Sequence, residues 1–127
     1  MLIGRCDCGQ VRFTVEDTRP EVTMCHCGQC RRTSGHHWAS THAPFDKLTF
    51  QSDAGLKWYE SSDWAKRGFC GNCGSSLFYR MNDEDGIGIA AGCLDGPTGM
   101  TVSKHIFVAH KGDYYEIGDG KPQIETY

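Results

Sequence analysis

The chain has 127 residues, of which 39% are hydrophobic and 23% charged, and its formal net charge is −3. These values are ordinary for a globular protein and predict a single domain over residues 1–127. Because 16 acidic residues outnumber 13 basic ones, the chain lacks the positive field that attracts nucleic acid or an anionic membrane surface. No apolar run approaches the roughly 20 residues that span a bilayer. We therefore expect no nucleic-acid partner and no membrane partner.

The first residues, Met1–Cys6, lack the apolar stretch of a secretory signal peptide. We therefore expect a cytoplasmic protein. Eight cysteines in a reducing compartment are more often metal ligands than disulfides. A chain of this length builds only a modest core, so bound metal would also supply stabilisation that the core lacks.

Taken in chain order, the sequence predicts a mainly β protein. Val11, Phe13 and Val15 alternate with polar residues, which is the period of a half-buried strand. Short apolar runs between turn residues predict further strands at Val22–Cys25, Trp38–Thr41, Leu48–Phe50, Leu56–Glu60, Gly68–Cys70, Leu77–Arg80, Ile87–Ala91, Lys104–Ala109 and Tyr114–Ile117. Many short strands with glycine-rich turns favour a sandwich or an open barrel.

Two segments depart from this pattern. Arg31–Gly35 is predicted to form a single helical turn that the glycine closes. Gly118–Tyr127 is polar and contains a proline, so we expect it to lie over the surface.

Seven of the eight cysteines fall into three groups with short spacing: Cys6 and Cys8; Cys25, Cys27 and Cys30; Cys70 and Cys73. Zinc prefers tetrahedral sulfur and nitrogen ligands, and loops of this length present two thiolates without strain. Gly9 and Gly74 follow the outer two groups and can adopt the unusual backbone angles that a metal loop needs. The spacing therefore predicts zinc binding.

The number of cysteines predicts two unlike zinc sites. The outer groups form what we call the four-cysteine cluster: Cys6, Cys8, Cys70 and Cys73. The middle group forms the three-cysteine cluster: Cys25, Cys27 and Cys30. Four sulfurs complete a structural site, whereas three leave the fourth position of a zinc ion to water or substrate. We expect two Zn²⁺ ions, with the three-cysteine cluster only partly occupied.

Other interpretations of these cysteines are open. C-x-C spacing is poor for a local disulfide, and no βαβ pattern supports a redox role for Cys70 and Cys73. The main rival is a pair of purely structural zinc sites, with His26 or another histidine completing the second. Cys93 stands alone in an apolar run and is interpreted as a small buried side chain.

A zinc ion held by three thiolates carries a net charge of about −1, which makes it a poor activator of water. A thiol binds such a zinc well and loses its proton on coordination. The chemistry favoured is therefore the addition of a small thiol to an electrophile, or the reverse elimination.

Several residues near the three-cysteine cluster could assist. Arg31 and Arg32 follow Cys30 directly and could bind a carboxylate of an acidic thiol, although solvated arginines are an equally good interpretation. Histidine titrates near pH 6.5 and can carry a proton. The candidates are His26, His36, His37 and His105.

The order of these motifs resembles the glutathione-dependent formaldehyde-activating enzyme family. The resemblance runs through Gly4-x-Cys6-x-Cys8-Gly9-x-Val11-x-Phe13, Cys25-His26-Cys27-x-x-Cys30-Arg31-Arg32-x-x-Gly35, Arg67-x-Phe69-Cys70-x-x-Cys73-Gly74-Ser75-x-Leu77-Phe78, Gly92–Asp95, His105–Val108 and Tyr115–Ile117. These motifs cover nearly the whole chain in order, and together they are highly specific.

The resemblance implies a β-tent fold of small antiparallel sheets around zinc. It also implies a structural zinc on the four-cysteine cluster and a catalytic zinc on the three-cysteine cluster. The activity named for the family is a carbon–sulfur lyase (synthase) reaction in which glutathione adds to formaldehyde to give S-hydroxymethylglutathione. The fold also hosts proteins with other roles, including one resembling centromere protein V, so a non-catalytic zinc-binding interaction module is the alternative.

Overall fold

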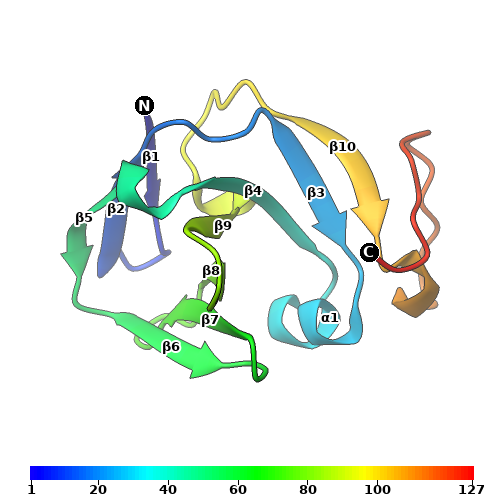
Figure 1. Cartoon of the computed structure of the whole chain (residues 1–127), viewed down its shortest axis with the longest axis horizontal. Helices are drawn as coiled ribbons and strands as arrows, with labels where there is room; N and C mark the ends of the chain where they lie inside the picture. The colour runs from blue at the N-terminus through cyan, green and yellow to red at the C-terminus, as the bar shows by residue number, and fades with distance from the viewer.

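The computed structural model describes residues 1–127, which form two β-sheets and one short α-helix (Figure 1). A three-stranded sheet has the order β1 (Leu2–Arg5), β2 (Val11–Val15), β5 (Leu48–Asp53). A seven-stranded sheet has the order β10 (Thr101–Ile106), β3 (Glu21–Cys25), β4 (Trp38–Pro44), β9 (Gly86–Ala90), β8 (Ser76–Met81), β7 (Ala65–Cys70), β6 (Leu56–Glu60). The helix α1 spans Gly28–Ser34, and short 3-10 turns occupy Phe45–Lys47, Ala91–Cys93 and Val108–His110.

The prediction of a mainly β protein with antiparallel sheets is confirmed. The exception to antiparallel pairing is β10, which runs parallel to β3 at the edge of the larger sheet. Every predicted strand but one overlaps a strand of the structure. The strand β1 was not predicted, because four residues beside the first cysteine give too short a pattern to recognise. No helix is long and apolar enough to cross a membrane.

The predicted strand Tyr114–Ile117 is wrong, since these residues form no β-ladder. The open edge of β10 is used instead by the last residues of the chain, where the His105 N–H donates to Pro122 and the Ile124 N–H donates to His105. Tyr114 and Tyr115 pack their rings on His36 and on one another. Their aromatic character, which suggested a strand, is explained by this side-chain packing.

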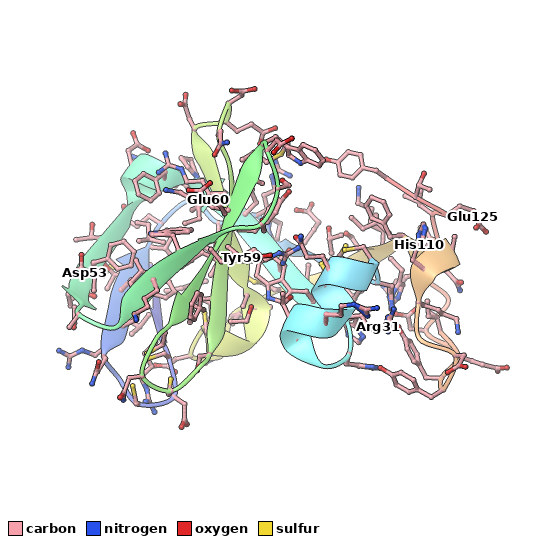
Figure 2. All side chains as sticks on the ribbon, turned by 90° about the horizontal axis from the view of Figure 1, so that it is seen from below. Arg31, Asp53, Tyr59, Glu60, His110 and Glu125 are labelled. Atoms are coloured by element: carbon pink, nitrogen blue, oxygen red, sulfur yellow. The ribbon has the colours of Figure 1, made fainter.

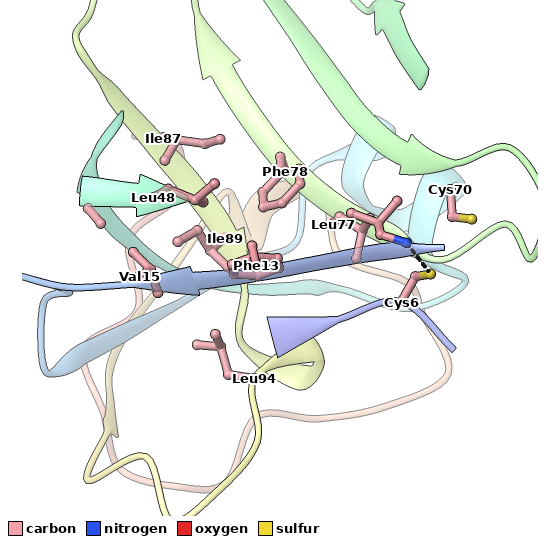
Figure 3. Packing of buried hydrophobic residues seen from close by; sticks show 12 residues of the cluster. Cys6, Phe13, Val15, Leu48, Cys70, Leu77, Phe78, Ile87, Ile89 and Leu94 are labelled. Atoms are coloured by element: carbon pink, nitrogen blue, oxygen red, sulfur yellow. Dashed lines mark hydrogen bonds between the residues drawn. The ribbon is translucent and has the colours of Figure 1, made fainter. Parts of the chain in front are cut away.

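The main core lies between the two sheets and reaches the four-cysteine cluster. The alternation in β2 buries Val11, Phe13 and Val15, as the sequence pattern predicts. Figure 3 shows Phe13 close to Phe78 of β8, with ring centroids 5.2 Å apart. Cys6 and Cys70 belong to the same buried cluster of side chains. Burial of this apolar surface is the main force that holds the sheets together.

The loop into α1 begins the helix earlier than predicted. Cys27 is its N-cap, and the Sγ atom of Cys27 accepts a hydrogen bond from the Cys30 N–H at 3.2 Å. Gly35 closes the helix in the left-handed conformation (φ 88°) and donates its N–H to the Arg31 carbonyl. The predicted turn at Arg31–Gly35 is therefore the second half of a helix that a cysteine sulfur caps.

Candidate metal centres

The four-cysteine cluster joins the two sheets. Cys6 and Cys8 follow β1 of the smaller sheet, whereas Cys70 ends β7 of the larger sheet and Cys73 lies in the turn that follows. All four Sγ atoms lie within 4.8 Å of one another. The Sγ atom of Cys8 lies 3.7 Å from that of Cys6 and 3.7 Å from that of Cys70. A tetrahedron with Zn–S bonds of about 2.3 Å has edges of about 3.8 Å, so the spacing fits this metal.

Both turns of this cluster use a glycine where the chain reverses. Gly9 has φ 82° and Gly74 has φ 81°, as the sequence predicts for metal loops. Ser75 connects the two turns. Its hydroxyl accepts a hydrogen bond from the Asp7 N–H and lies 3.2 Å from Cys73 Sγ. This hydroxyl is the main cause that lowers the pKa of Cys73 to about 5. At Cys73 the hydrogen bond thus favours the thiolate form that a metal requires.

The three-cysteine cluster lies at the junction of β3 and α1. Cys25 ends the strand, Cys27 caps the helix and Cys30 is in its first turn. Their Sγ atoms lie within 4.8 Å of one another. No further histidine, cysteine or carboxylate ligand atom lies within that distance of all three. The donor set fits a metal ion with one coordination position left open.

Hydrogen bonds among these sulfurs set their protonation in the metal-free cluster. Hydrogen bonds from Cys25 and Cys30 lower the pKa of Cys27 to about 2. The pKa of Cys25 is raised, first by its hydrogen bonds to Cys27 and Cys30 and then by burial. At Cys30 the hydrogen bond with Cys25 lowers the pKa, but the hydrogen bond to Cys27 and burial together outweigh it, so the pKa is raised. The cluster therefore favours the thiolate form at Cys27 and the thiol form at Cys25 and Cys30.

Arg67 of β7 also reaches the three-cysteine cluster, although β4, β9 and β8 separate β7 from β3 in the sheet. Its Nη2 donates to Cys30 Sγ at 3.4 Å, and its Nε donates to Gln29 Oε1 at 2.7 Å. Gln29 is fixed in turn by a hydrogen bond from its Nε2 to the Ser61 carbonyl. In the sequence Arg67 is visible only as part of a motif, because its contact with distant residues leaves no local pattern.

His26 points from the ligand loop into a chain of hydrogen bonds. Its Nδ1 contacts the hydroxyl of Tyr115, and its Nε2 lies 2.9 Å from Nδ1 of His105. The Nε2 of His105 lies 2.7 Å from Asp119 Oδ2. Because both nitrogens of His26 are engaged, the structure does not bring His26 to the three-cysteine cluster as a fourth ligand. From the sequence, Tyr115 was noted only within a predicted strand and a motif, and Asp119 was not singled out, since nothing local marks either residue for this contact.

The other predicted residues lie around α1. Arg31 is partly exposed, although its Nε is buried without a hydrogen-bond partner, and Arg32 is exposed. Figure 2 shows Arg31 on α1, and the C-terminal part of the chain, with His110 and Glu125, lies on one side of this helix. The Nδ1 of His36 lies 2.6 Å from the Tyr114 hydroxyl. Substrate contact by Arg31, Arg32 or His105 stays a prediction, and both nitrogens of His105 are engaged in this structure.

A hollow of about 570 Å³ lies beside the four-cysteine cluster. Its lining includes Trp38 and Ala90, which pack against Cys30, but none of the three cysteines themselves. Arg5 supplies one positive charge to the same lining, and Asp7 and Asp95 supply two negative ones. A volume in this range is typical of small-molecule sites.

Comparison with known proteins agrees with this architecture. An uncharacterized lyase of Schizosaccharomyces pombe is 27% identical over 123 residues, which cover 91% of this chain and 85% of that protein. A crystal structure of a Rhodobacter sphaeroides protein superimposes with a TM-score of 0.65 at 21% identity, covering 96% of this chain and 98% of the other. The aldose 1-epimerase of Escherichia coli is 29% identical over 85 residues, which are 63% of this chain but only 25% of the epimerase.

A family model described as "Glutathione-dependent formaldehyde-activating enzyme" matches residues 1–110. That range contains both cysteine clusters and Arg67. Both clusters could hold a metal ion, and the similarity to a lyase agrees with an enzymatic role. The chain belongs to the glutathione-dependent formaldehyde-activating enzyme family.

Proposed function

We propose that this protein is a zinc-dependent carbon–sulfur lyase (synthase) that joins a small thiol, glutathione, to formaldehyde or a similarly small aldehyde. The observation that carries the proposal is the contrast between the two clusters, one with four sulfur ligands and one with three. In this proposal the protein is a single cytoplasmic domain over residues 1–127.

The four-cysteine cluster would hold a structural zinc that ties β1 to β7. Cys25, Cys27 and Cys30 would hold the catalytic zinc, which supplies positive charge that favours the thiolate form of an incoming thiol. Zinc fits both donor sets. The four-cysteine cluster offers four sulfurs at tetrahedral spacing, and the three-cysteine cluster offers three sulfurs, which leaves one coordination position open.

The hollow beside Trp38 is the proposed binding site for the rest of the thiol. Glutathione carries carboxylates at both ends and an ammonium group at one. Arg5 and Asp95 offer charges of both signs in the lining, and Arg31 or Arg32 could bind a second carboxylate. A peptide-sized thiol therefore suits the volume of the hollow better than a simple alkyl thiol does.

The reaction needs little covalent machinery. The thiolate sulfur attacks the carbonyl carbon, the carbon–sulfur bond forms, and the electron pair of the C=O π bond moves to oxygen. The proton that the thiol lost is balanced by the proton that this oxygen takes from water. The protein contributes position, which brings two dilute reactants together in one geometry.

Exchange NMR tests this assignment directly. Glutathione and formaldehyde at equilibrium should interconvert with S-hydroxymethylglutathione faster when zinc-loaded protein is added. Cys30→Ser should return the exchange to the uncatalysed rate, whereas Asp46→Asn should not, because Asp46 is exposed and lies near the end of β2 that is away from Cys6. Equal exchange rates with and without the fully zinc-loaded wild-type protein would exclude this pair of substrates.

The alternative, a non-catalytic zinc-binding module, makes a different prediction for thiol binding. Two closed sites would leave the zinc X-ray absorption spectrum unchanged when glutathione is added. An open three-cysteine site should exchange its fourth ligand for sulfur. The absence of a fourth protein ligand near Cys25, Cys27 and Cys30 supports the enzymatic proposal.

A further inference from the structure

Arg67 is a charged residue buried without an acidic partner. Only 7% of its surface is exposed. Its guanidinium lies over the ring of Tyr79, 4.9 Å from the centroid, and 5.6 Å from the centroid of Trp38. Its Nη1 is buried and has no hydrogen-bond partner. Arginine stays protonated at any physiological pH, so this position holds a permanent positive charge.

The structure contains no carboxylate that compensates this charge. Its ion pairs are Lys47 with Asp17 and His105 with Asp119, neither of which involves Arg67. A buried charge without a counter-charge costs several kcal/mol, so a counter-charge is expected nearby. The anionic group in contact with Arg67 is the three-cysteine cluster, through Cys30 Sγ.

We propose that Arg67 is the fixed counter-cation of the three-cysteine centre and selects an anionic fourth ligand there. This inference rests on the proposed function, since it assumes a metal held by that cluster. Three thiolates and a divalent metal sum to −1, and Arg67 brings the sum to zero. A thiolate can then bind without building up a net charge of −2 in a buried site. A neutral ligand such as imidazole gains nothing from the arginine charge.

The contacts of Arg67 hold its guanidinium beside the three-cysteine cluster. Gln29 fixes Nε, and the aromatic rings of Trp38 and Tyr79 limit movement of the guanidinium plane. Gln29 belongs to the ligand loop itself, so the arginine and the cluster are positioned by the same segment. Arg67 is thus a positioning residue that acts on the substrate through the charge of the centre.

Ligand binding to cobalt-substituted protein tests the proposal without any catalytic assay. Co²⁺ replaces zinc in the three-cysteine cluster and reports its fourth ligand by absorption. Azide and 2-mercaptoethanol serve as sources of anionic ligands, and imidazole serves as the neutral one. In Arg67→Met we expect affinity for the anionic ligands to fall about tenfold or more, while affinity for imidazole changes less than about threefold. Arg67→Lys, which keeps the charge, should stay near the wild type in the ratio of the two affinities.

Each outcome decides the question. Equal weakening of both ligand classes, or no weakening of either, overturns the proposal. If Arg67→Met and Arg67→Gln fail to retain two metal ions while Arg67→Lys retains both, the charge requirement stands; loss of metal from Arg67→Lys as well overturns it. If wild-type protein binds none of these ligands, the open site itself is wrong. If ligand selection behaves as expected but glutathione exchange is not accelerated, only the substrate assignment fails.

Discussion

His26 and His105, which are 79 residues apart in the chain, lie with Nε2 and Nδ1 at 2.9 Å in the buried layer behind the three-cysteine cluster. His26 stands between two of the cysteines, whereas His105 belongs to β10 and is held by Asp119. The contact therefore fixes the ligand loop to the edge strand and to the C-terminal segment. It explains why a protein with a small core keeps two histidines almost fully buried.

Removal of His105 should loosen this connection. In His105→Leu the Nε2 of His26 loses its partner in a buried site, which costs about 1–3 kcal/mol of unfolding free energy. Denaturant unfolding of the zinc-loaded protein measures the change. His110→Leu is the matched control, because His110 is exposed and should change the unfolding free energy by less than about 0.5 kcal/mol. Equal effects of the two substitutions would contradict a role for the buried pair.

Acid should destabilise the protein through His26. Burial, followed by the neighbouring His37, lowers the pKa of His26 to about 4 from an ordinary 6.5. Between pH 6.5 and 4 the unfolded chain therefore binds a proton at His26 that the folded protein does not bind. The contribution of His26 to the free energy of unfolding is present above pH 6.5 and is lost as the pH falls towards 4. His26→Gln should show a shallower loss over this window than the wild type. Metal-thiolate protonation contributes to both proteins, and the difference between their melting temperatures isolates His26.

The two cysteine clusters should differ in what they do for stability. The four-cysteine cluster joins both sheets and lies in the main core, so Cys70→Ser should lower the melting temperature by more than ~10 °C. Cys30→Ser should have a smaller effect on melting, because the three-cysteine cluster joins only neighbouring segments at the start of α1.

Metal content per chain, measured alongside melting, checks this difference. Cys93→Ala is the control, since Cys93 belongs to neither cluster and its removal should leave two zinc ions bound. A Cys30→Ser protein that melts as early as Cys70→Ser would contradict the separation into a structural and an open site.

Features that depend on local sequence patterns could be predicted from the sequence. The alternation in Val11–Val15, the cysteine spacing and the glycines at both metal turns predicted β2 and the two sulfur clusters. The roles of residues that reach the site through long-range pairing could not be predicted. Arg67 arrives by pairing β7 against β8, and Asp119 arrives through a segment without regular structure. Such contacts depend on the register of distant strands, which no local period records.

Zinc uptake by the three-cysteine cluster should depend on pH with a defined slope. In the metal-free cluster Cys27 is a thiolate, its pKa being lowered to about 2 by hydrogen bonds from its neighbours, while the pKa values of Cys25 and Cys30 are raised. Zinc requires all three as thiolates, so binding displaces two protons. The affinity for the second zinc ion should then rise about 100-fold per pH unit between pH 6.5 and 7.5. Competition with a chelator of known pH dependence gives this slope, and a pH indicator in weak buffer counts the protons. Three ordinary thiols would release about three protons near neutral pH, so a slope of three would show that Cys27 is protonated and that the sulfurs do not share a single thiolate.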